Sequence, residues 1–174
     1  TCGYAPFGNK SLAVDDASIQ YLDFYAYFKD VLAQKNSIFY TFGKTLGGTN
    51  IAVFSYYLSS PFMLLSVFFP KENLHSFFDI LVLLNLSLAS MTFSIFLVNR
   101  FRKYLTENTE SARTFFVVLL SCCYGLCQYT IAQSSNIMWI DGVYLLPLIL
   151  LGTYQIIHGS SIWKLSVWVA LSIL

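Results

Sequence analysis

Three apolar runs of membrane-spanning length constrain this chain more than any other feature. A helix needs about 20 mostly apolar residues to cross a bilayer. Residues 77–98, 114–132 and 137–157 meet this requirement, and residues 162–174 begin a fourth run that stops at the chain end. Charged residues make up only 11% of the chain, and no basic stripe suited to nucleic acid is present. The sequence therefore predicts an all-α, multi-pass membrane protein, and its ends suggest a piece of a longer one.

The charge of one connecting loop predicts the orientation of these helices. Residues 99–113 carry Arg100, Arg102, Lys103 and Arg113 against two glutamates. Cytoplasmic loops are enriched in Lys and Arg, so this loop is expected to face the cytoplasm. Residues 1–76 would then lie on the outer side of the membrane.

Residues 51–69 leave that orientation open, because they contain no charge and could be counted as a further span. The centre of such a span would be Ser59-Ser60-Pro61, which places hydroxyls and a helix breaker where unpaired backbone groups cost most. An interfacial or re-entrant pair of short helices that breaks near Pro61 fits better. If the segment did cross, residues 1–50 would move to the cytoplasm.

An amphipathic helix is predicted over about residues 16–34. Its polar side chains recur at spacings of three and four, which places them in one stripe. The rest of the helix surface is largely aromatic and suits packing near a membrane surface. The stripe consists of Asp16, Gln20, Asp23, Tyr27, Asp30 and Gln34.

The pair Asp15-Asp16 at the start of this helix has two interpretations. Carboxylates are scarce, with nine in 174 residues, and two adjacent acids beside a membrane could serve as a base or as ligands. Alternatively, one of them caps the helix by accepting a backbone N–H near the positive end of the helix dipole. A capping carboxylate would still be oriented, so the two interpretations are compatible.

Four other residues are candidates for binding substrate. Gln20 lies on the face of Asp16 and could orient it or bind a sugar hydroxyl, and Tyr21 is its neighbour. Lys44 sits among glycines and could pair with a phosphate. Asp141 lies near the outer end of a span, where an ionisable residue is a functional hypothesis by default. Each residue also has an explanation without a function: Gln20 would be solvated, Tyr21 packed in the core, Lys44 a surface lysine and Asp141 hydrated.

Metal and cofactor chemistry has little support in the sequence. No histidine or acid accompanies Cys122, Cys123 and Cys127, and neither histidine has a partner at ligand spacing. No cofactor or metal site is therefore predicted, although a divalent metal stays open.

Several segments together resemble the YfhO family of bacterial membrane proteins. They occur in the family's order and cover most of the chain. Met63 departs from the family, which often has Asn there. The segments are YAPFGNKSL at 4–12, DASIQYLDF at 16–24, FGKTLGG at 42–48, YLSSPF at 57–62, NIMWID at 136–141 and LLPL at 145–148.

The resemblance implies a GT-C type glycosyltransferase fold, with many membrane helices and a large first outer loop that carries interfacial helices. Such enzymes transfer sugar from a polyprenyl-phosphate donor, and this family is linked to glycosylation of lipoteichoic acid and related envelope polymers. The family's catalytic acid precedes Gln-Tyr by four residues, which corresponds to Asp16. Two other classes stay open: a transporter or flippase of lipid-linked sugars, for which Asp141 and Asp79 would matter, and a structural envelope-assembly subunit.

Overall fold

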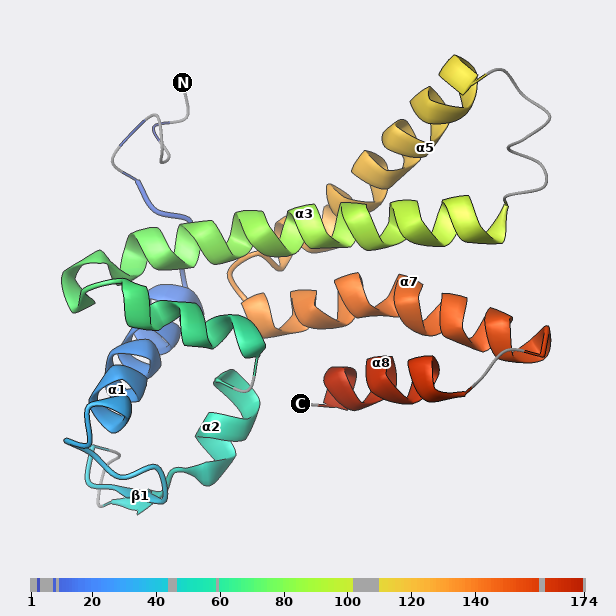
Figure 1. Cartoon of the computed structure of the whole chain (residues 1–174). Coiled ribbons are helices and arrows are strands. Elements are labelled where there is room, and N and C mark those ends of the chain that lie inside the picture. The colour runs from blue at the N-terminus through green and yellow to red at the C-terminus, as the bar shows by residue number, and fades with distance from the viewer. Residues whose placement is uncertain are drawn as a thin grey trace. The chain divides into compact units, whose positions relative to one another are not determined.

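The computed structural model describes residues 3, 8, 10–43, 47–58, 60–101, 110–159 and 162–173 (Figure 1). Most of these residues are helical, and the two strands found among them have two residues each. The prediction of an all-α membrane protein is confirmed. The chain divides into two compact units, Thr1–Val82 and Leu83–Ile173, and each is described by itself.

Three helical segments in the described part of the chain are long and apolar enough to cross a membrane. They are Lys71–Arg100, Ser111–Ala132 and Ile137–Ile157. The first contains the short 3-10 helix η3 (Lys71–Asn73) and α3 (Leu74–Arg100), and the third is α7 (Ile137–Ile157). A further helix, α8 (Trp163–Ile173), has 11 described residues and packs beside α7.

The second span is broken, although the sequence predicts an uninterrupted helix there. α5 (Glu110–Gly125) ends two residues before α6 (Gln128–Ala132) begins. The hydroxyl of Thr130 donates to the carbonyls of Gly125, at 2.8 Å, and Cys127, at 2.9 Å. Thr130 is fully buried. Its side chain thus bonds to the Gly125 carbonyl at the break, and it shares the Cys127 carbonyl with the backbone N–H of Ile131, which lies 3.2 Å away.

In the first unit, the predicted amphipathic helix forms as two joined parts. A π-helical turn, η1 (Ala17–Tyr21), leads into α1 (Leu22–Leu32). At the other end, Lys35 N–H bonds to Asp30 C=O at 2.8 Å and Gln34 N–H to Val31 C=O at 3.0 Å. These two bonds form a Schellman motif, in which Gln34 takes the left-handed position (φ 58°) that glycine usually occupies.

Residues 51–69, taken in their described parts, contain two short helices. They are α2 (Ile51–Tyr57) and the 3-10 helix η2 (Pro61–Phe68), and they are bent by 94° relative to each other. Neither is long enough to cross a bilayer alone. The hairpin β1 (Tyr40–Thr41) and β2 (Gly48–Thr49) precedes them, with Tyr40 opposite Thr49.

A cluster of aromatic rings forms the core of the first unit. Tyr21 and Tyr25 on the first helix meet Phe77 and Phe78 at the start of α3, and all four are at most 1% exposed. Ring centroids lie 5.6 Å apart for Tyr25 and Phe77 and 6.3 Å apart for Tyr21 and Phe78. Such edge-to-face pairs contribute about 0.5–1.5 kcal/mol each beyond the area they bury. The first helix is therefore held against α3.

The second unit depends on close helix approaches. A Cβ placed on Gly125 would lie 2.0 Å from Ser90 Oγ and 2.9 Å from the carbonyl of Leu86, so α5 can approach α3 there only with glycine. The rings of Phe93 and Tyr124 stack at 4.4 Å nearby. Small residues permit such contacts between membrane helices.

Candidate functional site

The acidic pair lies at the start of the first helix, but it does not cap it. Asp15 takes a left-handed backbone conformation (φ 50°), which Asp tolerates better than most residues. Asp16 occupies the position before η1, yet its side chain makes no capping hydrogen bond. Its backbone is already helical (φ −59°, ψ −29°), whereas a capping residue usually has an extended backbone. The capping interpretation is therefore wrong, and the exposed carboxylate of Asp16 is left to other contacts.

Gln20 contacts Asp16 and is itself held from another helix. Gln20 Nε2 lies 3.5 Å from Asp16 Oδ1, and the hydroxyl of Tyr57 at the end of α2 donates to Gln20 Oε1 at 3.0 Å. A hydroxyl that donates to the amide oxygen leaves the amide N–H₂ group facing the carboxylate. We call the row Tyr57–Gln20–Asp16 the acid relay. It holds an amide donor beside an exposed carboxylate.

Tyr21 belongs to the core rather than to the exposed face of this site. Its side chain is 1% exposed, and its ring lies 5.2 Å from that of Tyr57 and 6.3 Å from that of Phe78. Burial, followed by the nearby Tyr57, Tyr56 and Asp16, raises the pKa of the Tyr21 phenol far above its usual range, so it stays neutral. Its hydroxyl has no hydrogen-bond partner among the described residues. Tyr21 thus supports the ring that holds Gln20.

Asp79, an acid of the first span, has a structural role in the first unit. Its Oδ1 accepts hydrogen bonds from the Ser11 hydroxyl at 2.8 Å and the Leu12 backbone N–H at 2.7 Å. The carboxylate is only 8% exposed. It therefore ties the segment that leads into Asp15 and Asp16 to the start of α3.

The two remaining predicted residues, Lys44 and Asp141, are not part of the acid relay within the first unit. Lys44 lies outside the described residues. Asp141 belongs to the second unit, where Asn85 Nδ2 on α3 approaches its Oδ1 at 3.5 Å. Asn85 is 2% exposed, and its Oδ1 has no partner among the described residues. The pair is a polar contact within the candidate spans.

A metal-binding arrangement is not found in the described part of the chain: no three His, Cys, Asp or Glu side chains gather there. The acid relay instead offers an exposed carboxylate with a fixed amide donor beside it. Such a carboxylate can accept a proton from a hydroxyl group, and the amide can bind a second oxygen of the same molecule.

Sequence reasoning missed Tyr57. It lies 37 residues from Gln20, and helical periodicity carries no information on contacts of that range. The only signal was its position in the segment YLSSPF, and it is one of 12 tyrosines in the chain.

These spans, the bent pair of short helices and the acid relay define a polytopic helical membrane protein with an acidic site in the segment before its first candidate span. The sequence family described as bacterial membrane protein YfhO matches residues 1–174. The chain belongs to this family. Searches of curated proteins and of solved structures each found no match.

Proposed function

We propose that this chain is part of a membrane glycosyltransferase. The enzyme would move a sugar from a polyprenyl-phosphate donor to an envelope acceptor such as lipoteichoic acid. The observation that carries the proposal is the acid relay, because it presents the carboxylate in the position where the family pattern expects the catalytic acid. Asp16 would accept the proton of the acceptor hydroxyl as its oxygen attacks the anomeric carbon. The polyprenyl phosphate would leave in the same displacement, and the configuration at that carbon would invert.

The distribution of positive charge supports an outer location for this chemistry. Arg100 ends α3, and its guanidinium lies 4.3 Å from the ring centroid of Tyr154 near the end of α7. Lys164, at the start of α8, follows shortly after this end of α7 in the chain. By the positive-inside rule this end of the second unit would face the cytoplasm. The start of α3 would then lie at the outer face, and so would the acid relay of the segment before it.

Exposed apolar side chains support contact of the first unit with the bilayer. On η2, Leu64, Val67 and Phe68 are more than half exposed, whereas Met63 and Ser66 are buried. An apolar face of this kind suits the lipid interface. Met63 is therefore a core residue, and this chain lacks the polar side chain that Asn would supply at this position.

The test of the proposal is bond formation by the full-length protein in nanodiscs, with a radiolabelled polyprenyl-phosphate sugar and purified lipoteichoic acid. A glycosidic product supports the enzyme. Movement of the donor across a sealed bilayer without a product would replace it with a transporter. That second candidate is favoured by one observation, the Asn85–Asp141 contact between two candidate spans, since ionisable residues within spans are costly and usually functional.

Tyr57→Phe is expected to reduce the transfer rate about three- to tenfold, because it removes one hydrogen bond that orients Gln20, worth roughly 1 kcal/mol. KM for the donor should change little. Gln20→Ala should reduce the rate at least as much. The measurement is a double-mutant cycle on kcat: if Tyr57 acts through Gln20, adding Tyr57→Phe to Gln20→Ala costs nothing further. Independent, multiplying losses would show that Tyr57 does not position Gln20.

A further inference from the structure

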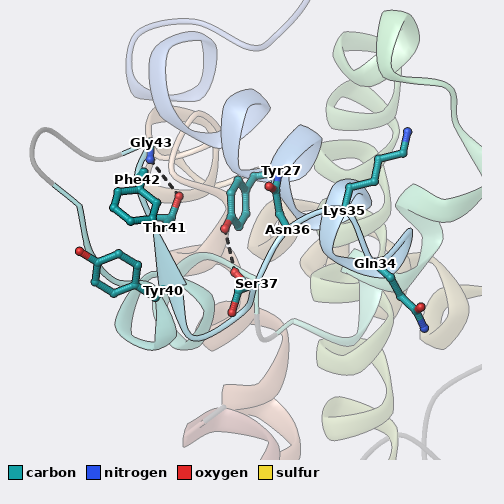
Figure 2. Close-up of a pocket in the computed structure, with 9 residues that line it drawn as sticks. All are labelled: Tyr27, Gln34, Lys35, Asn36, Ser37, Tyr40, Thr41, Phe42 and Gly43. Carbon is teal, nitrogen blue, oxygen red and sulfur yellow. Dashed lines mark hydrogen bonds between the residues drawn. The ribbon is translucent and has the colours of Figure 1, made fainter.

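A cavity of about 760 Å³ lies at the C-terminal end of α1, beside the β1–β2 hairpin (Figure 2). Nine of the described residues line it, and these nine lie within residues 27–43. Three of them are aromatic, Tyr27, Tyr40 and Phe42, and most of the others carry amide or hydroxyl groups. None of these nine described residues is aliphatic, and one, Lys35, is charged. This volume lies in the range of sites that hold small molecules, about 300–1,000 Å³.

Two aromatic rings form one side of the cavity. The centroids of Tyr40 and Phe42 are 5.1 Å apart, and their planes meet at 74°. Phe42 is 83% exposed and Tyr40 46% exposed, so ring faces are open to a ligand. The hairpin sets the Tyr40 ring through Gly47 (φ 89°), where a Cβ would lie 2.5 Å from the Tyr40 hydroxyl. Exposed rings fixed in this way form a binding surface rather than a core.

Polar groups complete the cavity. The Tyr27 hydroxyl donates to the Ser37 carbonyl at 2.7 Å, which fixes the loop after α1, and the Thr41 hydroxyl accepts from Gly43 N–H at 3.1 Å. Gln34 enters this loop in the left-handed conformation of the Schellman motif that ends α1.

This combination fits a carbohydrate. A sugar ring has C–H faces that pack on aromatic rings, and its hydroxyl groups bond to amides and hydroxyls. A lipid chain would instead need aliphatic walls, and a phosphate would favour more cations than Lys35, the one cation among the described lining residues. We propose that this cavity binds a sugar unit of a carbohydrate chain through Tyr40 and Phe42.

The cavity would hold a part of that chain far from the reacting group. Asp16 precedes η1 and Gln34 follows α1, and the helical residues Ala17–Leu32 between them extend for roughly 24 Å at about 1.5 Å per residue. Taken with the proposed function, on which this step rests, the bound chain is the acceptor polymer. Binding energy from such a remote part of a substrate can be used to position its reacting end.

The test compares the full-length protein in nanodiscs with its Tyr40→Ala/Phe42→Ala variant on a printed panel of bacterial envelope saccharides, without donor. The wild type should bind at least one saccharide, and the variant should bind it at least tenfold more weakly. Phe39→Ala is the matched control, because Phe39 is 67% exposed on the same hairpin but does not line the cavity. Absence of saccharide binding by the wild type, or equal binding by the double variant, would overturn the proposal.

Two further measurements separate this site from its alternatives. If Phe42→Trp fluorescence is quenched by brominated lipids in the nanodisc, the hairpin is a membrane anchor and the saccharide site is rejected. If the double variant loses transfer to a long acceptor through KM but keeps transfer to a short one, the site serves the acceptor chain. Saccharide binding by a protein that forms no glycosidic bond would reject the proposed function and leave the cavity assignment intact.

Discussion

Asp16→Asn in the full-length protein is expected to reduce glycosyl transfer by about 10²–10⁴-fold, which is the usual contribution of a general base. Asparagine keeps the size of the side chain and can still contact Gln20, but it cannot accept the proton. Because Asp16 is exposed and makes no capping bond, the variant should fold and insert as the wild type does. The measurement is the initial transfer rate at saturating donor.

Asp23→Asn is the control for this prediction. Asp23 is another exposed acid in the first turn of α1, and it lies outside the acid relay. The substitution should leave the transfer rate within about twofold of the wild type. Near-wild-type transfer by Asp16→Asn, or equal losses in both variants, would remove Asp16 from the chemistry.

Lys29→Met is expected to give the largest loss of local stability, about 2–3 kcal/mol. The Lys29 ammonium on α1 donates to the carbonyl of Ser66 at 2.8 Å and to that of Phe69, at the end of η2. The Ser66 carbonyl also accepts from the Phe69 N–H at 3.1 Å, so the ammonium joins α1 to the last turn of η2. A hydrogen bond to a charged group is worth about 1.5–3 kcal/mol. Hydrogen exchange of the amides in residues 61–69 of the full-length protein measures the effect.

Lys71→Met provides the matched control for Lys29→Met. Lys71 pairs with Asp30 at 2.6 Å, but its side chain is 45% exposed. An exposed ion pair of this kind contributes about 0–1 kcal/mol. Equal effects of the two substitutions on exchange would show that the Lys29 contacts do not hold η2 against α1.

Hydropathy predicted the spans well because it depends only on local composition. Residues 137–157 correspond to α7 (Ile137–Ile157), and residues 77–98 lie within α3. The break between α5 and α6 was not predicted, since it depends on a threonine side chain that bonds to carbonyls of the preceding turn. Composition gives no information on which carbonyl a threonine hydroxyl bonds to.

The part of the site that lies on one helix could also be predicted, because helical spacing is a local property of the sequence. The spacing of Asp16 and Gln20 placed them on one helix face, and their side chains are 3.5 Å apart. The Tyr57 contact and the Ser11–Asp79 contact join segments 37 and 68 residues apart, and only the packing of the aromatic cluster brings them together. The expected capping bond failed because the backbone of Asp16 is already helical.

Chemical rescue tests the central claim that a carboxylate at position 16 performs the transfer. Asp16→Cys, in a variant with the other cysteines replaced, should be inactive. Iodoacetate converts the thiol into a side chain that ends in a carboxylate, whereas iodoacetamide adds a neutral amide of nearly the same size. We expect iodoacetate to restore transfer by at least tenfold and iodoacetamide to restore none. Equal recovery with both reagents, or full transfer by untreated Asp16→Cys, would contradict the claim.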